Sequence, residues 1–438
     1  MTKLFSSDLL IKFRRSSFFR YFNYINSIYI KPKLNSLFYW VLFFNSFYLF
    51  QIFTNWWTLR ITRGGAPEFW DLNIVLRWAK CFETYGLGVY KYQVNDSCTG
   101  YVYGSNFLRA LSLFNLYENY TRLLGLLFLF FISALMGGLS EHLLSDKKMK
   151  KSLILVVFCS PPIWLLVASG NFDILIIYLI LFSALLFFHN YKGYSLMLLS
   201  CATIIKFYTF PLLLIVFLSI RKKRLKIFSA ACLVVVTLIV VSDLKYTRGN
   251  STFASEYFFT FGVINPGAWW NILVNKLNFP DLGLSVLQKY LFGFLLMGLV
   301  TYWIARLTIT RASNIINAVP SELKFDLEET IFSFFGITYC VLFLQGGNFD
   351  YKLFYLAVAG LFYIRVYQKR IIFTLLLAAS LWMSCFSFGL SSEFVPSVKV
   401  STIYVAIQLF GDAANFIITS FILVALFEMF TSKKFSKH

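Results

Sequence analysis

Charged side chains that could do chemistry gather in a few polar segments between long apolar runs. One of these segments, EFWDLNIVLRW, places Asp71 directly after Phe69 and Trp70, with Arg60, Arg63 and Arg77 nearby. A carboxylate partly removed from water there could act as a general base toward a hydroxyl group, worth about 10²–10⁴ in rate, and the arginines could bind a phosphate. Alternatively, Asp71 lies in the first turn of a helix that begins near Pro67, where it stabilises the helix dipole by about 0.3–1 kcal/mol.

Two other short segments, GNFD and GGNFDYK, combine amide, acidic and basic side chains. The first contains Asn171 and Asp173, and the second contains Asp350, Tyr351 and Lys352. These side chains are candidates for binding a substrate phosphate or sugar. The alternatives are that Asn and Asp cap the helices that follow, and that Lys352 is an interfacial lysine whose ammonium extends into water.

A third candidate is Lys206, which interrupts the apolar stretch 195–220 together with Pro211. Lys192 precedes this stretch and RKKRLK follows it, so both of its ends are typical of the cytoplasmic side. Two half-length helices that enter and leave from that side would satisfy both ends, and an intramembrane lysine is a functional candidate by default. A single long helix with Lys192 outside is the alternative.

The elements that position these residues are predicted from composition. The chain has 438 residues, of which 58% are hydrophobic and 14% charged, against about 25% charged in soluble domains. Apolar runs of about 17–25 residues recur along the chain, long enough to cross a bilayer. The net charge of +20 is therefore interpreted through membrane topology and anionic membrane lipid, with no role for nucleic acid. We find no nucleotide-binding glycine motif and no HExxH zinc motif.

The sequence predicts an all-α polytopic transmembrane bundle with about ten full spans plus a broken or re-entrant helix pair. Residues 1–36 form a basic cytoplasmic tail, and residues 37–438 form a single transmembrane catalytic domain. The positive-inside rule places both termini in the cytoplasm and two long loops, about 55–121 and 243–288, outside. Cys81 and Cys98 share the first loop, so a disulfide between them is allowed but not required.

These segments resemble a known superfamily. The order of a short tail, a span, and an external loop with an aromatic-flanked Asp71 followed by GLGVY and YVY is similar to the start of GT-C membrane glycosyltransferases. GNFD with the Lys206 helix, and GGNFDYK, resemble motifs of the polyprenol-phosphate-mannose-dependent α-mannosyltransferases. The spacing from Lys206 to Pro211 is longer than in that group, and Lys352 stands where arginine is usual. The composition also suits bacterial O-antigen glucosyltransferases.

The resemblance implies transfer of glucose or mannose from a polyprenyl-phosphate sugar to a hydroxyl of a lipid-linked or cell-envelope glycan, such as O-antigen lipopolysaccharide. Asp71 would be the base, and a cation such as Lys206 or Lys352 would stabilise the departing phosphate. The site would face the periplasm from a bacterial inner membrane. A polyprenyl-phosphate sugar synthase and a flippase would supply the donor. No cofactor is expected, although a divalent cation on Glu68, Asp71, Asp173 and Asp350 is left open.

Two other functions remain open. A lipid-linked sugar flippase or transporter would also have about a dozen apolar segments, but the loop GGLSEHLLSDKKMKK lacks the motif of major facilitator carriers, and the polar groups lie on one face rather than along a central path. A polysaccharide polymerase or ligase of similar fold is the closer alternative, and the sequence barely separates it from a glycosyltransferase.

Overall fold

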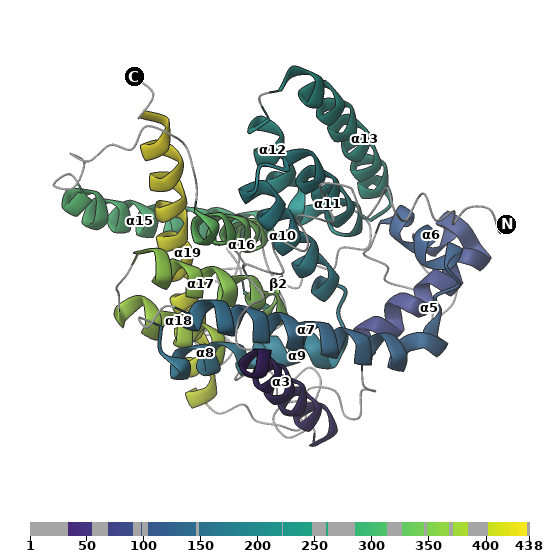
Figure 1. The fold of residues 1–438 in the computed structure, drawn as a ribbon, viewed down its shortest axis with the longest axis horizontal. Helices are drawn as coiled ribbons and strands as arrows, with labels where there is room; N and C mark the ends of the chain where they lie inside the picture. The colour runs from purple at the N-terminus through teal and green to yellow at the C-terminus, as the bar shows by residue number, and fades with distance from the viewer. Residues whose placement is uncertain are drawn as a thin grey trace.

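The protein is helical in nearly all of the residues that the computed structural model describes. These are residues 34–54, 69–90, 98, 104–145, 149–220, 222–247, 260–261, 285–312, 326–345, 348–367, 371–383 and 402–435. The all-α prediction is confirmed for them, apart from one pair of two-residue strands (Figure 1). Residues 1–33 of the predicted tail 1–36 and much of both long loops lie outside the described residues, and residues 34–36 belong to the first described helix.

The first part of the chain forms an alternation of long and short helices. They are α3 (Leu34–Thr54), α5 (Trp70–Tyr85), η1 (Gly86–Tyr90), α6 (Ser105–Leu113), η2 (Glu118–Tyr120), α7 (Thr121–Leu144), α8 (Lys151–Phe158), α9 (Pro161–Ser169), α10 (Asp173–Phe188), α11 (Lys192–Ile205), η3 (Phe207–Thr209), α12 (Phe210–Leu218) and α13 (Lys223–Thr247).

The second part continues with α15 (Val286–Ala312), α16 (Leu327–Leu344), η5 (Asp350–Leu353), α17 (Phe354–Tyr367), α18 (Ile371–Met383) and α19 (Thr402–Phe435). The strands β1 (Thr260–Phe261) and β2 (Asn348–Phe349) pair antiparallel, with Thr260 opposite Phe349.

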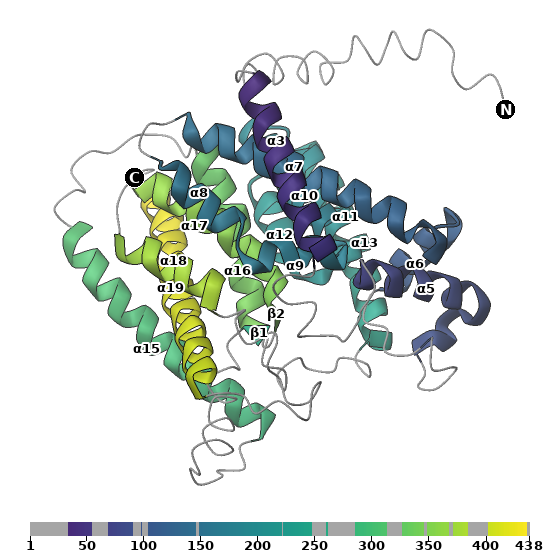
Figure 2. The same cartoon turned by 90° about the horizontal axis from the view of Figure 1, so that it is seen from below.

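The core of the bundle is built around α16 and α17. All ten residues from Phe354 to Tyr363 are buried, and so is 72% of the apolar window of α16. By contrast, α13 and α15 bury 17% of theirs and lie at the edge of the bundle (Figures 1 and 2). Their apolar side chains remain exposed, as expected for helices that face lipid.

The lengths of the helices bear on the predicted number of spans. Among the described residues, five helices are long and apolar enough to cross a membrane, or six if α8 and α9, bent by 45° at the break between them, count as one. The protein is therefore a multi-pass membrane protein. Six other helices in this part of the chain are apolar over only 10–17 residues, so the ten full spans stay a prediction.

The segment around Lys206 is broken rather than continuous. Helix α11 ends before Lys206, whose backbone is extended (φ −145°, ψ 123°), and α12 begins with Pro211 in its first turn. The Lys192 Nζ donates to the backbone oxygen of Ser219 at 2.7 Å, so the start of α11 lies beside the end of α12. This is the arrangement expected of a re-entrant pair, and the single long helix is wrong.

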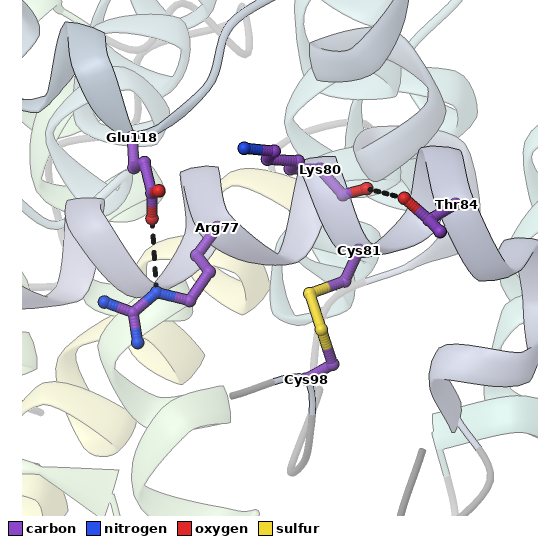
Figure 3. Close-up of a disulfide and its surroundings, with 6 residues drawn as sticks. All are labelled: Arg77, Lys80, Cys81, Thr84, Cys98 and Glu118. Atoms are coloured by element: carbon purple, nitrogen blue, oxygen red, sulfur yellow. Dashed lines mark hydrogen bonds and ion pairs between the residues drawn. A yellow bond between two sulfur atoms is a disulfide. The ribbon is translucent and has the colours of Figure 1, made fainter. Parts of the chain in front are cut away.

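A disulfide joins Cys81 in α5 to Cys98, with their Cα atoms 5.9 Å apart (Figure 3). The sequence had only allowed this bond. It ties the chain after η1 back onto the helix that carries Asp71, and so limits how far that part of the first loop can separate from α5.

Candidate active site

The start of α5 is fixed by an unusual residue just before Asp71. Phe69 has a positive φ of 58°, which is rare for a bulky side chain. Its backbone N–H donates to the oxygen of Ala168 at 2.9 Å. A Cβ added at Gly125 would lie 2.3 Å from the Phe69 ring, and one at Gly170 would lie 3.0 Å from the Phe69 Cβ. The two glycines therefore admit Phe69, which packs α5 onto α7 and α9.

The turn between α9 and α10 brings an amide and an acid to the same place. Gly170 ends α9 with a φ of 64°, and the Oδ1 of Asn171 accepts the backbone N–H of Asp173 at 2.9 Å. Phe172, the residue directly before α10, makes no side-chain cap, and the side chain of Asn171 satisfies this N–H of the first turn as the predicted cap would. The same side chain, however, also donates from Nδ2 to the Oδ2 of Asp71 at 2.9 Å. Asn171 and Asp173 are 2% and 1% exposed, so both are held inside the protein.

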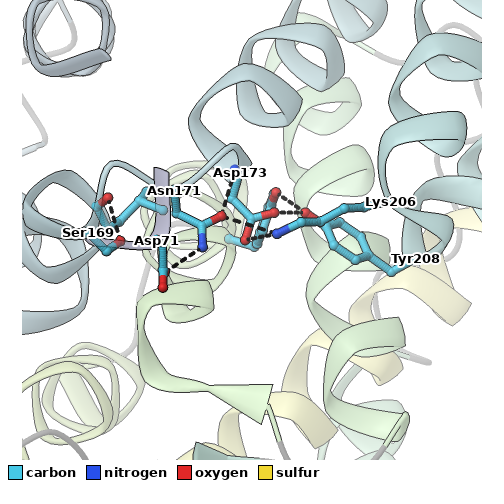
Figure 4. A network of polar contacts seen from close by, with 8 residues as sticks. Asp71, Ser169, Asn171, Asp173, Lys206 and Tyr208 are labelled. Atoms are coloured by element: carbon cyan, nitrogen blue, oxygen red, sulfur yellow. Dashed lines mark hydrogen bonds and ion pairs between the residues drawn. The ribbon is translucent and has the colours of Figure 1, made fainter. Parts of the chain in front are cut away.

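Lys206 joins this group from the break between α11 and η3 (Figure 4). Its Nζ lies 3.0 Å from the Oδ2 of Asp173 and 3.1 Å from the Oδ1 of Asn171, to which it donates. Because α10 and α11 form a hairpin of similar arm lengths, the end of α11 reaches the start of α10. The lysine that entered from the cytoplasmic side in the predicted topology thus meets the two polar residues of the GNFD turn.

Two tyrosines complete the network behind Asp173. The Tyr208 hydroxyl donates to the Oδ1 of Asp173 and lies 2.7 Å from the Tyr355 hydroxyl. Tyr355 is fully buried in α17, while Tyr208 lies in η3 and is 5% exposed. Neither tyrosine could be chosen from the sequence, because a tyrosine in an apolar run is usually a core residue with one polar end.

Lys352 approaches from η5, which packs against α9. Its Nζ lies 5.9 Å from the centre of the Tyr208 ring. Burial lowers the pKa of Lys352 to about 8, the charge of Lys206 acts in the same direction, and Asp173 and Asp71 act against it. Two acids and two lysines, from four separate parts of the chain, therefore share one electrostatic environment.

Other predicted site residues are not brought into this group. Arg77 is half exposed and pairs with Glu118 at 3.3 Å (Figure 3). It also donates to the Oδ1 of Asn73 at 3.1 Å. Arg60, Arg63 and Glu68 lie outside the described residues. For Asp350 and Tyr351 the structure describes the backbone, in η5, but not the side chains.

Metal binding has no dedicated group of ligands in the part of the chain that the structure covers, where no three His, Cys, Asp or Glu side chains are placed to hold an ion. Asp71 and Asp173 both contact Asn171, and Asp173 also contacts Lys206 and Tyr208. What the arrangement offers chemically is a partly buried carboxylate near two partly buried lysines, one of which is ion-paired with Asp173.

The fold and site define a class: a multi-pass helical membrane protein with a buried charged centre. Comparison with known families narrows this class. Residues 107–312 match the model of glycosyltransferase family 87 (GT87), a family of GT-C membrane glycosyltransferases. The match covers slightly less than half of the chain and includes Asn171, Asp173 and Lys206, but neither Asp71 nor Lys352. No curated protein and no solved structure matches the chain. The match supports the resemblance to GT-C enzymes. The sequence motifs alone did not identify GT87 as the family.

Proposed function

We propose that the protein is a membrane glycosyltransferase that moves a hexosyl residue, glucose or mannose, from a polyprenyl-phosphate sugar to a hydroxyl of a lipid-linked or cell-envelope glycan. The observation that carries this proposal is the contact of Asp71 with Asn171, which also binds Lys206. It links a carboxylate to a cation in residues partly covered by the GT87 match.

In the reaction, Asp71 takes the proton of the acceptor hydroxyl while that oxygen attacks the anomeric carbon. The bond from this carbon to the phosphate oxygen breaks, and the polyprenyl phosphate leaves with the electron pair. One negative charge therefore moves from Asp71 to the phosphate. The ammonium groups of Lys206 and Lys352 are fixed before the reaction, and such cations stabilise charge that develops in the transition state.

A lipid-bound donor suits this architecture. A polyprenyl tail stays in the bilayer and holds its phosphate at the surface, so the enzyme needs no nucleotide-binding domain. The donor then reaches the enzyme by lateral diffusion in the membrane. The site has to bind only its phosphate, its sugar and the acceptor hydroxyl. Helix α10 begins and helix α11 ends at this cluster, which supports a phosphate-binding role for the polar groups there.

The reaction is assigned to the periplasmic side of a bacterial inner membrane. The positive-inside rule puts Lys192, at the start of α11, and the basic segment that begins α13 in the cytoplasm. Lys206 follows the other end of α11, and Asp173 begins α10, the helix before it. Both therefore lie away from the cytoplasmic side. A disulfide in the first loop fits an oxidising compartment. Both termini would then be cytoplasmic, and a synthase and a flippase would supply the donor.

The test is sugar transfer by the purified protein in lipid, with polyprenyl-phosphate glucose or mannose as donor and lipid-linked glycans as acceptor. We expect Asp71→Asn to reduce transfer by about 10²–10⁴. Glu83→Gln is the matched control, because Glu83 is an exposed carboxylate on the same helix that accepts from the Tyr117 hydroxyl at 2.7 Å.

Other outcomes would favour the alternatives. Movement of a lipid-linked sugar across vesicles, without any transfer by the wild type, would indicate a flippase or transporter. Joining of whole glycans, rather than addition of one sugar, would indicate a polymerase or ligase. Normal transfer by Asp71→Asn would remove Asp71 from the mechanism and leave it as an acid in the first turn of α5.

A further inference from the structure

One amide group connects Asp71 to Lys206. The Nδ2 of Asn171 donates to the Oδ2 of Asp71 at 2.9 Å, and its Oδ1 accepts from the Nζ of Lys206 at 3.1 Å and from the backbone N–H of Asp173 at 2.9 Å. All four residues come together at one turn (Figure 4). Asn171 is 2% exposed, so these contacts are not exchanged with bulk water.

The orientation of this amide is fixed by its partners. An ammonium and a backbone N–H can only donate, and an ionised carboxylate can only accept. Turning the amide by 180° would place its NH₂ group against two donors and its oxygen against the Asp71 carboxylate. The contacts therefore hold Nδ2 toward Asp71. The ammonium of Lys206 also polarises the amide, which strengthens the hydrogen bond that the other end donates.

We propose that Asn171 is a positioning residue for Asp71, which holds the carboxylate in the orientation needed to accept the acceptor proton and keeps it ionised. This inference rests on the proposed function, in which Asp71 is the base. Asp173 has a separate part, because its 3.0 Å ion pair balances the charge of Lys206. Lys206 therefore acts on Asp71 through the amide of Asn171, whereas Lys352 from η5 interacts with the charge of Asp71 without this amide.

The alternative is that Asn171 only caps α10. Two substitutions separate this alternative from a positioning role. Asn171→Asp keeps an oxygen for Lys206 and for the Asp173 N–H, but places a second carboxylate oxygen against Asp71. Asn171→Ser keeps a good helix cap, but its shorter side chain has no amide to donate to Asp71. A residue that only caps the helix would tolerate both changes.

The first readout does not depend on activity. Dicyclohexylcarbodiimide modifies carboxyl groups in their protonated form, so its rate of reaction with Asp71, followed by mass spectrometry from pH 4 to 9, reports when Asp71 takes up a proton. In both variants we expect the labelling midpoint to rise by about one pH unit or more, because a hydrogen bond to the charged form has been lost. Asn171→Asp should give the larger shift, since it adds a like charge.

The second readout is the pH profile of transfer. The acidic limb of kcat should move upward by the same amount, while the KM for the donor stays near its wild-type value. Asn73→Asp is the matched control, because it makes the same substitution on α5 where the side chain contacts Thr121 and Arg77 instead. It should shift neither the labelling midpoint nor the profile.

The outcomes are distinct. A folded Asn171→Asp or Asn171→Ser protein with an unchanged labelling midpoint and pH profile would overturn the proposal and leave Asn171 as a cap. If the wild type transfers no sugar but the variants shift the labelling midpoint, the link between Asn171 and Asp71 stands, and it is the proposed function that fails.

Discussion

Removing one partner of the ion pair between Lys206 and Asp173 should cost more stability than removing both. Their charged atoms lie 3.0 Å apart, and the side chains are 13% and 1% exposed. At this separation, and with an effective dielectric constant of about 20, the Coulomb attraction is about 5 kcal/mol. Breaking one partner of a buried pair costs about 3–5 kcal/mol, because the other charge stays buried. We expect this cost for Lys206→Met and for Asp173→Asn.

The double variant should recover much of that loss, because neither buried charge remains. We expect a coupling free energy of about 2–3 kcal/mol between the two sites, measured by reversible unfolding in mixed detergent micelles. The pair Arg77 and Glu118 is the control, since its atoms lie 3.3 Å apart but its side chains are 43% and 42% exposed. Such surface pairs contribute about 0–1 kcal/mol.

Two results would refute this reasoning. The first is a loss of stability in Lys206→Met no larger than that in Arg77→Met. The second is strict additivity of the Lys206 and Asp173 changes. The double variant has a further use: it should be folded but inactive in transfer, so that loss of activity in the single variants cannot be assigned to unfolding alone.

Three further predictions follow from other parts of the structure. Since burial lowers the pKa of Lys352 to about 8, its ammonium loses a proton as the pH rises through 8, and sugar transfer should fall there. In a pH profile of transfer from pH 6 to 10, Lys352→Arg should extend the active range to higher pH. The fully buried Asp243 accepts the backbone N–H of Ser105 at 3.0 Å at the start of α6; Asp243→Ala should cost about 1–3 kcal/mol, measured by unfolding. The disulfide of Cys81 and Cys98 spans 17 residues; replacing both cysteines by serine should cost about 3 kcal/mol, and a reductant should destabilise the wild type by a similar amount while leaving the serine variant unchanged.

The positions of the apolar runs and charges were enough to predict the helical membrane architecture and the break at Lys206. The break follows from local facts: basic residues flank both ends of a run too short for two crossings, and Pro211 cannot continue the helix before it. Asn171 as a cap was predictable for the same reason, since it depends on three consecutive residues. Such features need no knowledge of which helices pack together.

The contacts that make the site depend on packing and could not be predicted. Asp71 and Asn171 are 100 residues apart in sequence, and Tyr208 and Tyr355 are 147 apart. Nothing in the local sequence says that these residues meet. Arg77 shows the opposite case: it was chosen for being near Asp71 in sequence, but six residues along a helix turns its side chain to another face, where Glu118 binds it.

The shortness of α10 and α11 bears directly on where the site can work. At about 1.5 Å per residue, their 16 and 14 residues span roughly 24 and 21 Å, less than a hydrocarbon core of about 30 Å. Polar groups at the end of such helices lie deeper than the end of a full span, and they must be covered by protein or a water-filled cavity. Asp173 and Lys206 meet that condition through each other and through α17.

A phosphate carried by a lipid tail can descend to this depth more easily than a soluble nucleotide sugar, because its tail already occupies the bilayer. If the proposed transfer is correct, these short helices therefore favour a lipid-linked donor over a soluble one.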